Sequence, residues 1–242
     1  MLVSGFGLAI LAAFVTGSDT ASEDQMLALE TITERTDGKP AVPDTDDTKT
    51  KAGNGSQTRS PDDVGWLTVD GTAIDYPIVQ SGEGTPSDWY LSHDYWGSPS
   101  LHGHPFLDTR SRLDGQHLLI YGHRVGTTEK MFTQISSSHE PDRFMSIGSA
   151  TWTGNDQVPS MFLPLCSLKV DETYAAIQTF TFDGVEGLRR WLSALAERSN
   201  AQAPNARRLI EKSVRALTLV TCSSAVPNGP ERTLMIFVAS YG

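Results

Sequence analysis

Short apolar runs, each bounded by turn-forming residues, recur along the chain from residue 64 onward. Runs of this length suit β-strands, and the dipeptide Asp70-Gly71 suits the turn of a hairpin. The runs are residues 66–69, 76–79, 118–121, 161–163, 174–177, 217–220 and 234–238. All five tryptophans lie in this same part of the chain, so the hydrophobic core is expected here. The pattern predicts a mainly β domain over residues 64–242.

Two segments between the later strands follow a helical period instead. Over residues 184–198, apolar residues recur three and four positions apart, with charged residues between them. We expect a second helix to start at Pro204 and to carry Leu209, Ile210 and Val214. Short strands with inserted helices predict a closed or nearly closed β-barrel.

The segment before this domain has a different composition. Residues 36–63 contain no Leu, Ile, Met or aromatic residue, so they cannot bury enough surface to offset the entropy of ordering. Residues 1–63 hold 11 acidic and 5 basic residues, which is more than half of the net charge of −10. The acidic balance argues against a nucleic-acid-binding protein, which would show a basic face. We therefore expect residues 19–63 to form a short helix and a flexible stalk.

The first 18 residues carry no charged side chain. As a helix they would span about 27 Å, which is close to the thickness of a bilayer core. We expect a membrane anchor, with a cleaved signal-like segment as the alternative. Either alternative places the domain outside the cytoplasm. A capping box at residues 22–25 predicts the short helix, over residues 22–35.

Two cysteines are too few for a disulfide framework, so their individual settings matter. Cys222 ends the strand predicted at residues 217–221, where a side chain is held rigidly and can still reach a cleft. A small buried hydrophobe is the alternative for any lone cysteine. Cys166 fits that alternative better, because it lies inside an apolar run with no base nearby.

Two further residues lie at strand ends. His123 follows the run at residues 118–121, and Gly122 is expected to permit a bend that turns the imidazole out of the sheet. Arg232 opens the last strand ten residues after Cys222, beyond a loop rich in proline, asparagine and glycine. This order of strand, loop and strand places Arg232 beside Cys222. Taken singly, the histidine could be structural and the arginine a solvated surface charge.

These residues carry a resemblance to a known family. The sequence Thr218-Leu219-Val220-Thr221-Cys222 resembles the Thr-Leu-x-Thr-Cys signature of sortases, and Tyr121-Gly122-His123 and Arg232 match the rest of the catalytic set of that family. The helical insertion at 184–198 resembles the feature that separates class B from class A. Residues 90–94 and 131–132 resemble class B as well. One departure is Arg124, since class B enzymes often carry Asn after the histidine.

The resemblance covers residues 64–242 and implies a sortase-type β-barrel of about eight strands, with a long helix before the cysteine strand. It implies a cysteine transpeptidase in which Cys222 is the nucleophile, His123 the general acid and base, and Arg232 the residue that positions substrate and stabilises the oxyanion. Thr221 and Ser223 flank the nucleophile and are expected to line the substrate groove. The resemblance implies no cofactor. His102 and His104 form a His-x-His pair, but no third metal ligand is apparent, so no metal is expected.

The implied substrates are secreted proteins with a C-terminal sorting motif, cleaved after Thr through a thioacyl intermediate on the cysteine. The implied acceptor is an amine of a peptidoglycan precursor, and the implied location is the outer face of the cell membrane. Three alternatives remain open. The acceptor could be a pilin lysine, the barrel could bind peptides without catalysis, or water could accept the acyl group, as in a cysteine peptidase.

Overall fold

The computed structural model describes residues 59–126, 128–224 and 229–240. The segment predicted as an anchor, residues 1–18, the helix predicted at residues 22–35 and most of the predicted stalk lie outside these ranges. Within them, no helix is both long and apolar enough to span a membrane. At the end of the predicted stalk, Ser60 is buried and its backbone N–H donates to the hydroxyl of Tyr95 at 3.1 Å.

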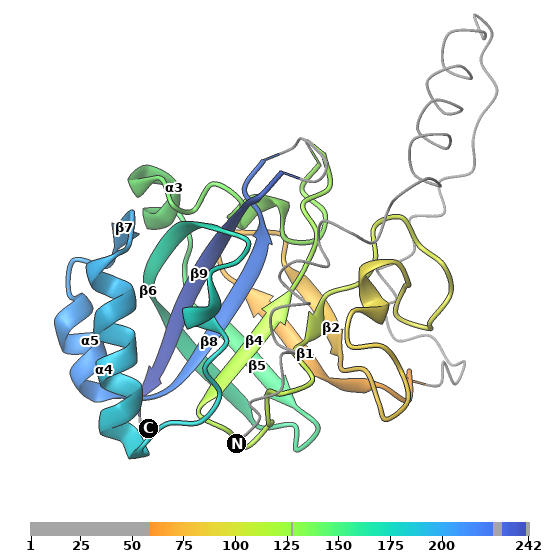
Figure 1. Ribbon diagram of the computed structural model, residues 1–242, viewed down its shortest axis with the longest axis horizontal. Helices are drawn as coiled ribbons and strands as arrows, with labels where there is room; N and C mark the ends of the chain where they lie inside the picture. The colour runs from red at the N-terminus through yellow and green to blue at the C-terminus, as the bar shows by residue number, and fades with distance from the viewer. Residues whose placement is uncertain (1–58, 127, 225–228, 241–242) are drawn as a thin grey trace, which may run out of the picture. The chain divides into compact units, whose positions relative to one another are not determined.

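Eight strands form a closed barrel (Figure 1). They are β1 (Asp63–Val69), β2 (Asp75–Val79), β3 (Phe106–Leu107), β4 (His117–Tyr121), β5 (Ala150–Gly154), β6 (Pro159–Asp171), β8 (Ser213–Cys222) and β9 (Glu231–Ser240). They are hydrogen-bonded in the order β5-β1-β2-β3-β4-β8-β9-β6, and pairing between β5 and β6 closes the ring. A short strand, β7 (Ala201–Gln202), pairs with β6. The predicted barrel of about eight strands is confirmed.

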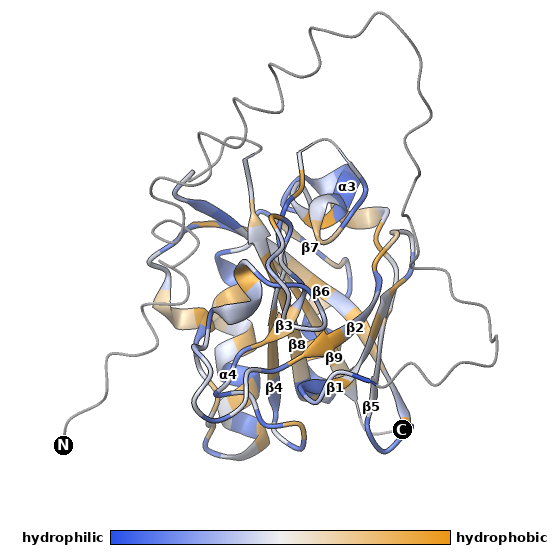
Figure 2. Ribbon diagram, turned by 90° about the vertical axis from the view of Figure 1, so that its right-hand side faces the viewer, coloured by the Kyte–Doolittle hydropathy of each residue, from blue (hydrophilic) through white to orange (hydrophobic). Residues whose placement is uncertain are grey.

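The hydrophobic side chains form two clusters, on opposite faces of the strands. Along β8, Leu217 and Leu219 belong to the inner cluster, which fills the barrel. Ala216 and Val220 belong to the outer cluster, which also contains apolar residues of helix α4 (Gly184–Glu197). The alternation follows from the period of two along a strand. Figure 2 shows the hydrophobic colour on strands such as β2, while the turn between β5 and β6 is hydrophilic.

Both helices predicted among the late strands are present, and they lie together on one flank of the barrel (Figure 1). Helix α4 covers the outer cluster beside α5 (Ala206–Lys212). The second helix was predicted to extend too far toward the C-terminus. It ends at Lys212, and Val214 already lies in β8, which pairs with the neighbouring strands. The strand predicted at residues 174–177 was wrong. This segment is the 3-10 helix η3 (Ala175–Ile177), and the carbonyl of Ala176 accepts the indole N–H of Trp191 on α4 at 2.8 Å.

The turn predicted at Asp70-Gly71 joins β1 to β2 as an antiparallel pair. Gly71 has a φ of 77°, in the left-handed region that glycine adopts without strain. A Cβ at this position would also lie 2.3 Å from the carbonyl oxygen of Ser146. The glycine is therefore required both by the turn and by the close approach of the backbone at Ser146, which is distant in the sequence.

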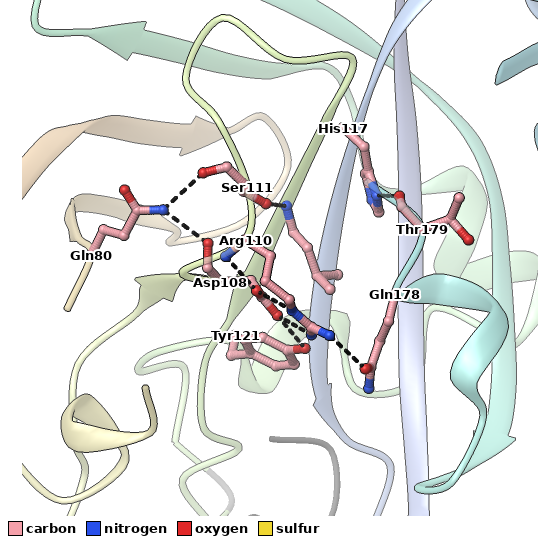
Figure 3. A network of polar contacts seen from close by, with 9 residues as sticks. Gln80, Asp108, Arg110, Ser111, His117, Tyr121, Gln178 and Thr179 are labelled. Atoms are coloured by element: carbon pink, nitrogen blue, oxygen red, sulfur yellow. Dashed lines mark hydrogen bonds and ion pairs between the residues drawn. The ribbon is translucent and has the colours of Figure 1, made fainter. Parts of the chain in front are cut away.

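A buried polar network joins the segment after β3 to the end of β4 (Figure 3). The carboxylate of Asp108 is fully buried and accepts hydrogen bonds from Nε and Nη2 of Arg110, at 2.9 and 2.7 Å, and from the hydroxyl of Tyr121 at 3.2 Å. Burial and the Asp108 charge raise the pKa of Tyr121, so its hydroxyl stays protonated and remains a donor. Gln178 accepts from the other end of the Arg110 guanidinium, at 3.1 Å. The network anchors Tyr121, which stands two residues before His123.

Replacing Asp108 by asparagine is expected to lower the free energy of unfolding by about 2–3 kcal/mol, because Arg110, whose side chain is 31% exposed, loses the fully buried carboxylate that balances its charge. Asp114→Asn is a matched control. Asp114 binds Arg112 through the same two guanidinium nitrogens, at 3.0 and 2.9 Å, but both side chains are more than 70% exposed. Exposed pairs contribute little, so this variant should unfold like the parent protein. Urea unfolding measures both, and equal losses would contradict the role given to the buried pair.

Candidate active site

Cys222 and Arg232 lie directly opposite each other on two neighbouring strands. Cys222 is the last residue of β8, Arg232 is the second residue of β9, and the antiparallel register pairs the two. Residues opposite each other in such a pair have their Cβ atoms about 4.5–5.5 Å apart, with side chains on the same face. Cys222 is partly exposed, while Arg232 is fully buried. The predicted placement of the arginine beside the cysteine is confirmed.

His123 leaves the barrel at the same end as Cys222. Strand β4 runs parallel to β8, and the last register pair between them joins Tyr121 to Val220. His123 and Cys222 each stand two residues beyond that pair. Side chains alternate between the two faces along a strand, so both lie on the same face as Tyr121 and Val220, which belong to the outer cluster. The backbone N–H of Gly122 donates to the carbonyl of Val220 at 3.0 Å, which continues the pairing past the end of β4. Neighbouring parallel strands therefore deliver the imidazole and the thiol to one site.

Two loops hold His123 in place. Its Nε2 bonds the carbonyl oxygen of Leu91 at 2.8 Å, and its own carbonyl accepts the N–H of Phe132 at 2.9 Å. A carbonyl oxygen only accepts, so Nε2 carries a proton and Nδ1 is the basic atom of the neutral ring. Leu91 and Phe132 come from the two segments that resembled class B in sequence. The sequence did not predict that both would bind the histidine.

Gly122 is needed for a different reason from the one predicted. Its φ does not fall in the positive range, so no glycine-specific bend turns the histidine outward. A Cβ at Gly122 would instead lie 2.6 Å from two ring carbons of Phe132. Real Cβ atoms do not approach so closely, and glycine therefore allows the aromatic ring to pack under the strand end.

Hydrogen bonds fix the guanidinium of Arg232 from two sides. Its Nη2 forms an ion pair with the carboxylate of Glu172 at 3.0 Å, and its Nη1 donates to the carbonyls of Gly229 and Glu231 at 2.5 and 3.1 Å. Glu172 directly follows β6, and its N–H donates to the carbonyl of Pro230 at 2.7 Å. Glu172 is thus tied to the loop that carries the arginine. Glu172 was not predicted from the sequence, where its only signal is an acidic side chain directly after a strand.

The pKa shifts describe a thiol and an imidazole that are both neutral at rest. Burial raises the pKa of the Cys222 thiol, and the charges of Arg232 and Arg124 oppose that rise. Burial lowers the pKa of His123, with the positive charge of Arg232 acting in the same direction. Both shifts favour a neutral thiol beside a neutral imidazole near pH 7. The thiolate fraction should therefore increase as the pH rises toward the raised pKa of the thiol.

The two residues that flank the nucleophile face away from it. Thr221 is fully buried on β8 opposite Thr233, on the side of the inner cluster. The hydroxyl of Ser223 lies 2.9 Å from that of Thr233, and the N–H of Ser223 donates to the carbonyl of Glu231 at 3.1 Å. Their role in lining the substrate groove stays a prediction.

Cys166 and His104 lie apart from this set, whereas His102 lies close enough to His123 for its charge to lower the pKa of that imidazole. Cys166 is buried in β6, and burial raises its pKa to about 12. His104 is buried as well and bonds the carbonyl of Pro77 at 2.9 Å, and burial lowers its pKa to about 4. Among the residues described, no cluster of three or more metal-ligating side chains occurs.

Known proteins share this fold. The structure is similar to that of Clostridium perfringens sortase B, with a TM-score of 0.63 and 24% identity, over 74% of this chain and 93% of that one. It is also similar to a Staphylococcus aureus sortase B–substrate complex, with a TM-score of 0.61 and 21% identity, over 73% of this chain and 79% of that one. A β-barrel with this architecture is the sortase B fold.

Sequence similarity supports the same class. The chain is 39% identical to Sortase B of Listeria monocytogenes over 71 residues, which is 28% of each protein. It is 34% identical to Sortase B of Staphylococcus aureus over 67 residues, 27% of this chain and 26% of that protein. The match thus spans less than a third of the length of these curated relatives. No family profile matches the chain. The resemblance to class B sortases is confirmed.

Proposed function

We propose that this protein is a cysteine transpeptidase of the sortase B type. The observation that carries the proposal is the pairing of Cys222 with Arg232 across β8 and β9, with His123 at the same end of the adjacent strand β4. These are a nucleophile, a fixed cation and a titratable base on one face of a barrel. The sortase B fold supports the same assignment.

The proposed reaction has two half-reactions, and His123 accepts and then releases a proton in each. The Cys222 thiol gives its proton to His123, and the sulfur attacks the carbonyl carbon of the substrate. The Arg232 guanidinium stabilises the negative oxygen that forms. The C–N bond then breaks, the amine leaves with the proton from His123, and a thioester remains. An incoming amine loses a proton to His123, attacks the thioester and releases the sulfur, which takes the proton back.

We propose a sorting motif of a secreted protein, cleaved after Thr, as the acyl donor, and an amine of the cell wall as the acceptor. A pilin lysine is the rival acceptor. The existence of a Staphylococcus aureus sortase B–substrate complex supports a substrate of the sortase B type. We further propose that residues 1–18 anchor the chain in the membrane, with the barrel outside, where both substrates would be found.

The full-length protein incubated with a library of Thr-containing peptides and several amines tests the proposal. Mass spectrometry should detect a thioacyl adduct on Cys222 for a subset of peptides. With an amine present, the amide product should exceed the hydrolysis product. Amines that mimic a wall cross-bridge or a lysine side chain then distinguish the two acceptors.

Two outcomes would contradict the proposal. If no peptide formed an adduct although iodoacetamide still alkylated Cys222, a peptide-binding barrel would be the better description. If adducts formed and water alone resolved them at every amine concentration, the protein would be a cysteine peptidase.

A further inference from the structure

Arg124 lies at the site although the catalytic scheme above does not use it. It follows His123 directly, and its Nη1 donates to the carbonyl oxygen of Ser223 at 2.5 Å. Ser223 is the residue after the nucleophile. The guanidinium therefore spans the ends of β4 and β8, and it lies next to the backbone that carries Cys222.

The backbone at Arg124 is held in this position by its surroundings. Arg124 forms an antiparallel bridge with Met131, and the N–H of Val125 donates to the hydroxyl of Thr133 at 2.8 Å. The Nε–H of Arg124 is buried and has no hydrogen-bond partner within the described part of the chain. A buried donor without an acceptor is costly, so the guanidinium retains capacity to interact with negative charge.

Among the described residues, four charged or titratable groups lie at the end of the barrel that carries the thiol. Arg232 comes from β9, Glu172 from the end of β6, and His123 and Arg124 from the end of β4. The Glu172 carboxylate is paired with Arg232, so much of the Arg232 charge is already balanced. Both Arg124 and Arg232 lower the pKa of Cys222 against the effect of burial. By contrast, none of the ion pairs found among the described residues involves Arg124.

We propose that Arg124 is a positioning residue that acts through Cys222, stabilising its thiolate as a second guanidinium beside Arg232. The inference rests on the proposed function, in which this thiolate is the nucleophile. An uncharged side chain at this position could not supply such a charge. The thiol should therefore ionise more readily here than Arg232 alone would allow.

The pH dependence of alkylation of Cys222 by iodoacetamide tests the proposal without any peptide substrate. Mass spectrometry follows Cys222 and Cys166 separately in the full-length protein. In Arg124→Gln, the midpoint of the pH profile for Cys222 alkylation should rise by about half to one pH unit, and the alkylation rate at pH 7 should fall about three- to tenfold. Arg124→Lys keeps the charge and should stay within about twofold of the parent. Arg112→Gln, which removes an exposed surface arginine, should leave the profile unchanged.

A wild-type profile in folded Arg124→Gln would overturn the proposal. Equal shifts in the Gln and Lys variants would also overturn it, because the loss would then follow from geometry and not from charge. Circular dichroism checks folding first, and Arg124→Met, which keeps the aliphatic stem, replaces the Gln variant if that one unfolds. Alkylation does not depend on sorting activity, so failure of the proposed function would show as missing peptide adducts and leave this readout intact.

Discussion

Cys222→Ala is expected to abolish thioester formation and amine transfer, with a loss of at least about 10³-fold, because the sulfur of Cys222 is the atom that forms the thioester. Cys166→Ala should retain activity. Burial raises the pKa of Cys166 to about 12, so this thiol supplies almost no thiolate near neutral pH. Peptide cleavage and intact-protein mass spectrometry measure both variants.

Cys166→Ala also serves as the control for folding. The side chain is completely buried in β6, and its removal should cost about 1 kcal/mol of stability. Cys222 is partly exposed at the end of a strand, so its replacement should cost no more than that. Equal loss of activity in the two variants, with both folded, would contradict the assignment of Cys222 as the nucleophile.

The barrel was predictable where its strands are buried on both faces. All five residues of β4 are buried, so the strand appears in the sequence as a continuous apolar run, and most of β8 and β9 behaves in the same way. Strands β3 and β7 have only two residues each, which is too short to leave any pattern. The segment 174–177 has the composition of a strand, but it winds into a 3-10 helix against α4 because tertiary contacts decide its conformation.

The site was predictable as far as its side chains have distinctive chemistry. The ten-residue spacing between Cys222 and Arg232 led directly to their cross-strand pairing. The carbonyl of Leu91, which binds His123, could not be predicted, because every residue carries the same backbone group. Glu172 was missed for a related reason, since a carboxylate after a strand is common and its partner lies sixty residues away. Long-range contacts of this kind depend on the closed barrel.

Arg232→Gln is expected to reduce kcat/KM by about 10²–10³-fold, the usual cost of removing a donor to the oxyanion. The same change should lower stability by about 3–5 kcal/mol, because Glu172, with a side chain only 17% exposed, would lose its charged partner. This one substitution therefore lowers both activity and stability. The double variant Arg232→Gln, Glu172→Gln separates the two effects, since it removes both charges and leaves two neutral groups that can hydrogen-bond.

Stability and activity should respond differently to the double change. In the double variant, the free energy of unfolding measured in urea should regain most of what Arg232→Gln alone loses, because no unpaired buried charge remains. The rate of thioester formation should stay low, because neither amide can replace a guanidinium at the oxyanion or beside the thiolate. If activity returned together with stability, Arg232 would act only by holding β9 against the loop after β6. Persistent inactivity in a stable double variant is the result expected if Arg232 contributes its charge to the reaction itself.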